Sequence, residues 1–119
     1  METDDFLAVA IPLMAETSTR HFVKRKERNW EQDLMDLGVD GLDKLWNMMM
    51  TLDKEEEQKP PELDHDGSGD LVYAFEKEMP NGIWAYIKLK IKSSNGKCVS
   101  ISCHPVEFGP RAMRSSEDN

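Results

Sequence analysis

The chain has 119 residues, 39% of them hydrophobic, and a formal net charge of −8 at neutral pH. This length supports one domain with a single core, and the negative charge argues against the loose binding of nucleic acids that needs a basic surface. No apolar run approaches the roughly 20 residues of a membrane span, and the acidic start METDD lacks the basic region of a signal peptide. We therefore expect a single cytoplasmic domain over residues 1–119 without a membrane partner.

The charges are distributed unevenly along the chain. Residues 20–28 hold five basic residues and one acid, and residues 86–97 hold four lysines and no acid. Residues 31–78, in contrast, hold fifteen acids and four bases. Solvated polar faces explain such segregation as readily as a binding surface does, so charge alone does not choose between the two.

The start of the chain gives two structural signals. Residues 4–16 are typical of a short amphipathic segment that is broken near Pro12, because proline lacks the N–H of a helical hydrogen bond. The tetrapeptide HFVK at 21–24 alternates apolar and polar side chains, as an edge strand does. We expect a short edge strand with basic flanks at this position.

Two helices are predicted next. Asn29 and Gln32 form a capping pair for a helix over WEQDLMDLG, which Gly38 ends. Asp40 with Asp43 predicts the cap of a second helix, in which apolar side chains recur at helical spacing. We expect these side chains to belong to the core rather than to a cofactor site, because methionine commonly fills gaps in cores. They are Leu42, Leu45, Trp46, Met49 and Met50.

The second half of the chain favours strands. Residues 52–70 contain two adjacent prolines and two glycines, which predict an exposed connection. A strand over 70–78, a tight PNG turn and two further strands over 83–92 and 97–105 follow. The tail 106–119 is expected to be flexible. The predicted fold is α+β, a small antiparallel sheet of three to four strands backed by two or three helices.

Alternation divides the last two strands into two faces. In IWAYIKLKIK the apolar side chains fall on one face, and Trp84, Tyr86 and three lysines fall on the other. In KCVSISCHP the same rule places Cys103 toward the core. It places Cys98 and His104 on the polar face, together with Ser100 and Ser102. Because Cys98 and Cys103 would point to opposite faces, a disulfide between them is not expected.

Two features of the sequence suggest a metal site, one for calcium and one for zinc, and neither is complete. The segment DHDGSGD (64–70) begins like a calcium-binding loop, but its twelfth position is Phe75 instead of a bidentate Glu. We therefore expect a polar turn there. Zinc would need more ligands at suitable spacing than two cysteines and three histidines offer here, since Cys103 and His104 point in opposite directions. No metal or other cofactor is predicted.

The polar face of the last two strands suits metal-free cleavage of RNA. A ribose 2′-hydroxyl must lose a proton and attack the adjacent phosphorus, and His104 suits acid–base work because imidazole titrates near neutrality. Lys88 and Lys90 can stabilise the charge on the phosphoryl oxygens. Tyr86 can orient the phosphate or base, or exchange a proton. A lysine-rich exposed sheet face without function would contain the same residues.

These segments also resemble a known family. GDLVYAFEKEMPNGIWAYIKLKIK and VSISCHP look like the C-terminal half of MqsR-type toxins of bacterial toxin–antitoxin systems, which are related in fold to RelE-type mRNA interferases. KRKERNWEQDLMDLGVDGLDKLWNMMMTLDKEE is similar to their paired helices, so the resemblance covers residues 20–107. It implies a small α+β domain and metal-independent endoribonuclease activity on mRNA. The implied partners are mRNA, a cognate antitoxin and the ribosome, and it stays open whether cleavage requires the ribosome.

The resemblance assigns particular residues. Tyr86 and Lys88 match the family's strand tyrosine and the lysine that follows it, and His104 takes the place of a Lys or His near the end of the last strand. A family glutamine has no counterpart, and Asp70 stands nearest to its position. Lys59 falls near a loop lysine of the family. RNA-backbone contacts are expected from four basic residues, Lys90, Lys59, Arg25 and Lys24.

A different class of function explains the acidity of the chain. The protein could be a non-catalytic binding module, or an acidic inhibitor whose carboxylates between Glu55 and Asp70 mimic a nucleic acid toward a basic partner. The nuclease hypothesis depends on the face with Tyr86, Lys88 and His104. The mimic hypothesis depends on the acidic segment instead.

Overall fold

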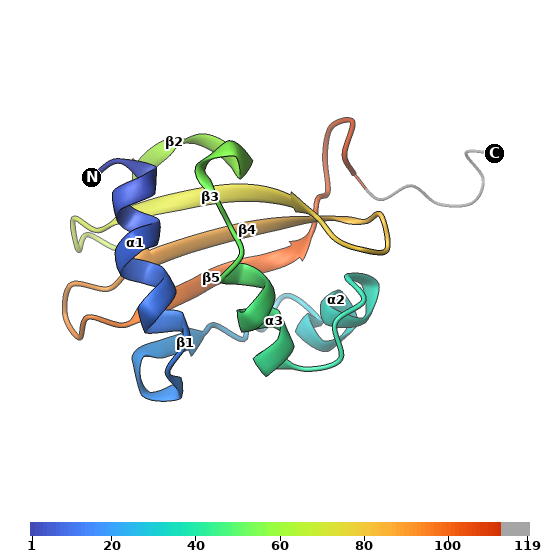
Figure 1. Ribbon diagram of the computed structural model, residues 1–119, viewed down its shortest axis with the longest axis horizontal. Coiled ribbons are helices and arrows are strands. Elements are labelled where there is room, and N and C mark those ends of the chain that lie inside the picture. Colours follow the sequence, from blue (N-terminus) through green and yellow to red (C-terminus); the bar gives the residue numbers. More distant parts are fainter. Residues whose placement is uncertain (113–119) are drawn as a thin grey trace.

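The computed structural model describes residues 1–112 and has an α+β fold, in which three helices accompany one five-stranded sheet (Figure 1). The helices are α1 (Thr3–Met14), α2 (Trp30–Asp36) and α3 (Leu42–Met49), with short 3₁₀ turns η1 (Thr17–Thr19) and η2 (Lys54–Glu56). The strands are β1 (Arg20–Phe22), β2 (Glu57–Leu63), β3 (Leu71–Glu78), β4 (Trp84–Ile91) and β5 (Cys98–Pro105). The predicted α+β class is confirmed.

The sheet is larger and less uniform than predicted. Its strand order is β1-β5-β4-β3-β2, with β1 parallel to β5 and every other neighbour antiparallel. The sheet is therefore mixed and five-stranded, whereas three to four antiparallel strands were expected. The predicted edge strand at 21–24 is confirmed as β1, which lies at the margin of the sheet beside β5.

The strand that the sequence prediction missed is β2. Residues 57–63 lie inside the predicted connection 52–70, and their two prolines, Pro60 and Pro61, argued against regular structure. An edge strand tolerates proline, because one side of its backbone has no neighbour to hydrogen-bond. The pairing of β2 with β3 is also interrupted twice by register shifts, the mark of bulges.

The first two helices follow their sequence signals in part. The side chain of Asn29 accepts a hydrogen bond of 3.1 Å from the Gln32 N–H, which confirms the predicted cap of α2. Helix α1, however, continues through Pro12 to Met14. Burial of its apolar face, including Phe6, compensates for the missing hydrogen bond. Within residues 1–112, none of the helices has the length and apolar character needed to span a membrane.

The predicted cap of α3 is wrong. The N-cap residue is Gly41, which has no side chain to accept a hydrogen bond. Asp40 instead pairs with Lys44 at 3.1 Å and Asp43 pairs with Arg20 at 2.8 Å. Both carboxylates are therefore engaged by cations rather than by the backbone of the helix.

The core lies between the sheet and the helices that cover one of its faces, with α1 and α3 in front of the strands in Figure 1. Phe6 of α1 stacks on Tyr73 of β3, with ring centroids 3.8 Å apart. From α3 the buried side chains include the predicted Leu45, Trp46 and Met49. The apolar side chains predicted to point inward from β4 are also buried: Ala85, Ile87 and Leu89.

A bulge divides β5 into two halves. Lys88 pairs with Ser102 and the next residue of β4, Leu89, pairs with Ser100, so Ile101 is an extra residue. The predicted alternation consequently holds only for the end of the strand. Cys98 and Ser100 turn into the core instead of facing away from it.

Both thiols are therefore on the core side, and the prediction that they point to opposite faces is wrong. Cys98 and Cys103 are free and belong to the same buried cluster. Burial raises the pKa of each thiol to about 12, so the reactive thiolate is scarce at ordinary pH.

We expect no reaction of the folded protein with a thiol reagent at pH 8 and two reactive thiols after unfolding in guanidinium. Rapid labelling of the folded protein would contradict this placement.

The first residues of the predicted tail contact the sheet. The Val106 N–H donates to the Trp84 carbonyl at 2.9 Å, and Val106 is buried. The guanidinium of Arg111 lies 4.0 Å from the centroid of the Trp84 ring and 3.1 Å from Glu76. The segment 106–112 thus contacts the start of β4 through Val106 and Arg111, while 113–119 lie outside the described residues.

Candidate active site

The open face of the sheet brings the three predicted catalytic residues together. Tyr86 of β4 lies directly opposite His104 of β5, with ring centroids 5.5 Å apart and planes inclined by 41°. Two residues along β4, Lys88 lies opposite Ser102. Alternation placed these side chains on one face, and the antiparallel register makes them neighbours.

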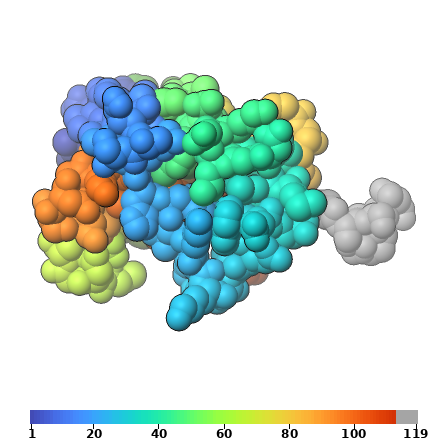
Figure 2. Space-filling model, turned by 90° about the horizontal axis from the view of Figure 1, so that it is seen from below, coloured from blue at the N-terminus to red at the C-terminus, as the bar shows by residue number. Residues whose placement is uncertain are grey.

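A cavity of about 350 Å³ lies over these residues. Arg25, predicted as an RNA contact, lines it together with the three predicted catalytic side chains. The segment after β1, which carries Arg25, forms the light-blue projection at the lower edge of Figure 2. Further lining residues are Gln58, Glu76, Ser102, Glu107 and Phe108.

The orientation of His104 fixes which of its nitrogens can exchange a proton. Nδ1 lies 2.8 Å from the Pro105 carbonyl oxygen, which can only accept a hydrogen bond, so Nδ1 carries the hydrogen. The other nitrogen, Nε2, is then the one that holds a lone pair in the neutral ring. Only 8% of His104 is exposed, so the surroundings hold the ring in place at the cavity.

Tyr86 is a neutral hydrogen-bond donor at ordinary pH. Burial raises the pKa of its phenol above the usual value, and the positive charge of Lys59 opposes this rise only in part. A protonated phenol can donate to a phosphoryl or ribose oxygen. The two side chains are therefore complementary, since Nε2 of the Nδ1-protonated imidazole offers a lone pair and the phenol offers a proton.

Two cations reach the cavity. Arg25 Nη1 donates to Ser102 Oγ at 3.1 Å, and Glu27 accepts from the same guanidinium at 3.1 Å. These contacts hold the guanidinium above β5. Among the described residues Lys88 has no ion-pair partner, so its ammonium can bind an anionic ligand.

The two acids that line the cavity each have an arginine partner. Glu76 pairs with Arg111 at 3.1 Å, and Glu107 pairs with Arg28 at 2.7 Å. The hydrogen bond from Arg28 is the largest cause that lowers the pKa of Glu107 below its usual value. Their negative charges are therefore largely compensated, and repulsion of a phosphate by these acids is reduced.

Lys90 does not belong to this site, contrary to its predicted role in RNA binding. It is 4% exposed, and its Nζ lies within 2.7–3.0 Å of the carboxylates of Asp64, Asp66 and Asp70. The turns after β2 and β4 meet at the same end of the sheet (Figures 1 and 2), where the Ser93 N–H donates to Asp70 at 3.3 Å. A distant loop has thus enclosed the ammonium.

The same cluster explains the segment that resembled a calcium loop. Its carboxylates converge on the ammonium of Lys90, which occupies the position where a cation would bind. Over residues 1–112 no group of three or more His, Cys, Asp or Glu side chains is arranged to hold a metal ion. The segment closes the end of the sheet as a polar turn.

The remaining predicted RNA contacts, Lys59 and Lys24, are engaged with neighbours. Lys59 pairs with Glu62 at 3.1 Å, and it lies near enough to Tyr86 to act on the pKa of the phenol. Lys24 Nζ lies 4.8 Å from the centroid of the Trp30 ring. Of the four predicted contacts, Arg25 alone is seen to line the cavity.

Several lining residues escaped the sequence prediction. Ser102 and Glu76 lie on the polar face by alternation. Only the register shows that Ser102 lies opposite Lys88 and Glu76 lies opposite Tyr86. Gln58 lies in β2, the strand that its prolines concealed. The segment with Phe108 was expected to be a flexible tail, and no local pattern marks it as part of a site.

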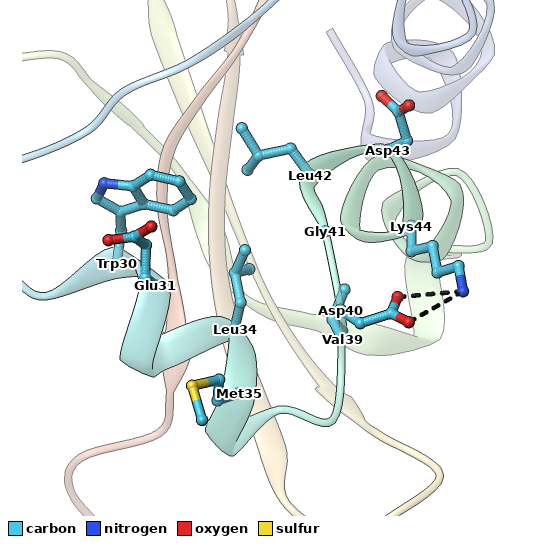
Figure 3. Close-up of a pocket in the computed structure, with 10 residues that line it drawn as sticks. All are labelled: Trp30, Glu31, Leu34, Met35, Val39, Asp40, Gly41, Leu42, Asp43 and Lys44. Atoms are coloured by element: carbon cyan, nitrogen blue, oxygen red, sulfur yellow. Dashed lines mark hydrogen bonds and ion pairs between the residues drawn. The ribbon is translucent and has the colours of Figure 1, made fainter.

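A larger hollow lies elsewhere, between α2 and α3, and has a volume of about 800 Å³ (Figure 3). Leu34, Met35 and Val39 are among its apolar lining residues, and the ion pair between Asp40 and Lys44 lies at one side. None of the ten side chains in Figure 3 is a histidine, tyrosine or cysteine. The smaller cavity on the sheet is therefore the better candidate for chemistry.

Comparisons of the chain with models of known families, with curated proteins and with solved structures find no match. The residues of the cavity and the chemistry that they can perform are therefore the basis for a function.

Proposed function

We propose that the protein is a metal-independent endoribonuclease that cleaves single-stranded RNA at the cavity on the open face of the sheet. The observation that carries the proposal is the direct opposition of Tyr86 and His104 beside Lys88. A proton acceptor, a proton donor and a lysine that has no ion-pair partner within residues 1–112 meet there at one cavity on the sheet.

The reaction follows from the lone pair that His104 can offer and the proton that Tyr86 can donate. His104 Nε2 removes the proton of a ribose 2′-hydroxyl, whose oxygen forms a bond to the adjacent phosphorus. The bond from phosphorus to the 5′ oxygen breaks, and the proton returns to that oxygen through the Tyr86 hydroxyl. The products are a 2′,3′-cyclic phosphate and a 5′-hydroxyl, so no water, metal or redox partner is consumed.

Lys88 and Arg25 stabilise the transition state. Negative charge develops on the phosphoryl oxygens during the attack, and fixed cations beside them lower the barrier. The planar guanidinium of Arg25 can bind two phosphate oxygens at once, and its contact with Ser102 orients it before the substrate arrives.

The biological role that we propose is that of a cytoplasmic toxin acting on mRNA and neutralised by an antitoxin. Its support is the resemblance of residues 20–107 to MqsR-type toxins and the RelE-like family, together with a candidate site on the strands where that family has its tyrosine and lysine. Ribosome dependence is a further point for the assay to decide.

The acidic-mimic hypothesis is weaker, because much of the acidic segment is engaged within the chain. Three of its aspartates bind Lys90, and Glu62 binds Lys59. Glu56 binds Lys77 at 2.9 Å. Carboxylates held in this way present less charge to an external basic partner.

The proposal is tested by incubating the purified chain with a long single-stranded RNA in EDTA and identifying the new ends. We expect cleavage that leaves 2′,3′-cyclic phosphate and 5′-hydroxyl ends, either on naked RNA in EDTA or on mRNA bound to ribosomes in magnesium buffer. Absence of cleavage under both conditions would refute the proposal, and inhibition by EDTA of the cleavage of naked RNA would refute its metal-free chemistry.

Lys88→Ala is expected to lower the cleavage rate about 100-fold, since loss of one group that stabilises a developing anion has an effect of about this size. The matched control is Lys92→Ala, which removes an exposed lysine beyond the end of the same strand. The measurement is the single-turnover rate at saturating enzyme. Equal rates for the two variants would exclude Lys88 from catalysis.

A further inference from the structure

Phe108 presents an aromatic ring to solvent at the rim of the candidate active site. It is 86% exposed, the highest value among the exposed large apolar residues of the described chain. It also lines the cavity that contains Tyr86, Lys88 and His104. A single exposed apolar residue is common on protein surfaces, so its position in this cavity is the informative feature.

The segment that carries Phe108 is held on both sides. Before it, Val106 is buried and bonded to the Trp84 carbonyl, and Glu107 is bonded to Arg28. After it, Arg111 lies over the Trp84 ring and binds Glu76. The ring therefore stands at a defined edge of the cavity rather than on an unattached tail.

The chemistry of the cavity differs between its parts. Lys88, Arg25 and the two proton-transfer groups suit the sugar–phosphate backbone. Phe108 offers no charge and no hydrogen-bonding group, and its exposed π-face suits a flat, uncharged partner. A nucleotide has both characters, because its base extends away from the phosphate on the other side of the ribose.

We propose that Phe108 forms a nucleobase-binding subsite, on which an unpaired base next to the cleaved phosphate stacks. This inference depends on the proposed function and deepens it by naming the substrate class. Stacking on an aromatic ring is tolerant of base identity, because every base has a π-face. In a duplex the faces of the bases are covered by their neighbours, so the subsite selects unpaired RNA of any sequence.

The test measures binding separately from cleavage. The probe is a fluorescent single-stranded oligoribonucleotide of mixed sequence with 2′-O-methyl groups, which lacks the attacking hydroxyl. A second probe has the same sugar–phosphate backbone without bases. Fluorescence anisotropy at one fixed salt concentration gives the dissociation constants for the full chain, for Phe108→Ala and for Phe108→Trp. Leu63→Ala is the matched control, since Leu63 is 64% exposed and lies in β2.

Phe108→Ala is expected to weaken binding of the base-containing probe about 10-fold or more, the range found when an aromatic stacking partner is removed. Phe108→Trp should bind at least as tightly as the wild type. The abasic probe should bind weakly and equally to all three proteins. Leu63→Ala should behave as the wild type with both probes.

The subsite is refuted if Phe108→Ala and the wild type bind the base-containing probe equally, or if the alanine variant weakens both probes alike. Failure of the proposed function gives a different pattern. Base-dependent binding lost in Phe108→Ala, without cleavage of ordinary RNA by the wild type, would retain the subsite and reject the nuclease. If neither probe binds the wild type, the subsite is rejected, and the cleavage assays on naked RNA and on ribosome-bound mRNA decide the nuclease separately.

Discussion

His104→Ala is expected to lower the rate of RNA cleavage by about 10²- to 10⁴-fold, the usual contribution of general acid–base catalysis. The reason is that Nε2 of His104 is the proton acceptor of the proposed reaction, since Nδ1 is held by the Pro105 carbonyl. The single-turnover rate in EDTA at pH 7.5 is the measurement. A rate within a factor of three of the wild type would exclude His104 from the reaction.

Two further variants separate catalysis from folding. His21→Ala is the matched control, because His21 is an exposed histidine of β1, and we expect it to retain full activity. His104→Gln keeps a polar side chain but has no basic ring nitrogen to accept the proton, so it should remain folded and inactive. Circular dichroism and the unfolding midpoint of each variant show whether loss of activity reflects loss of structure.

The same mechanism has a pH signature in Tyr86. Because burial raises the pKa of the phenol above its ordinary value of about 10, Tyr86 remains a proton donor throughout the neutral and mildly alkaline range. The cleavage rate should therefore show no decline caused by Tyr86 between pH 7 and about pH 9.5.

Lys90→Met is expected to lower the free energy of unfolding by about 3 kcal/mol, because it leaves the buried carboxylate of Asp70 without its cation. Lys90 is 4% exposed and Asp70 is 8% exposed, whereas the other two partners, Asp64 and Asp66, are more open to solvent. Methionine keeps most of the length of the side chain, so the change isolates the loss of charge. Urea unfolding measures the effect.

The sign of the pH dependence follows from the pKa shifts in this cluster. Hydrogen bonds from Ser68 and Lys90 lower the pKa of Asp66, and hydrogen bonds from Ser93 and Lys90 lower that of Asp70. A carboxyl group whose pKa is lower in the folded state stabilises the fold above its unfolded pKa, and the contribution disappears as pH falls. Wild-type stability should therefore decrease below about pH 4, and Lys90→Met should decrease less over that range.

Lys92→Met is the control for this prediction, because Lys92 is exposed and its replacement should change stability by less than about 0.5 kcal/mol. The double variant Lys90→Met/Asp70→Asn should lose less than the sum of the two single changes, since the residues interact directly. Additive losses would show that the cluster does not act as a unit.

The elements that the sequence predicted well are those in which local pattern and tertiary burial agree. Alternation in β4 placed Ala85, Ile87 and Leu89 in the core, and the Asn29 cap began α2 at its proper position. The strand β2 was missed because its prolines lower strand propensity, whereas the edge of a sheet tolerates them. Whether such a segment forms a strand depends on a partner strand elsewhere in the sequence, and the segment itself gives no sign of that partner.

The candidate site also contains residues that local pattern predicted and residues that it did not. Tyr86, Lys88 and His104 were grouped from alternation in two strands joined by a short turn, and the register brings them together. Lys90 shares their face by the same rule, yet a loop more than twenty residues away in sequence encloses its ammonium. Phe108 is the opposite case, since a residue outside any periodic element reaches the cavity because Val106 and Arg111 hold its segment.

Because Ile101 is an extra residue in β5, the alternation of side chains between the two faces restarts there, and the two halves of the strand alternate independently. In a regular strand Cys98 and His104 would lie on the same face of the sheet. If Cys98 pointed into the core, His104 would then have to point into the core as well. With the bulge, Cys98 lies in the core while His104 stays on the face of the cavity. The residues before the bulge can therefore vary with the demands of packing and those after it with the demands of a ligand. A deletion at Ile101 would couple the two sets again and displace one of them.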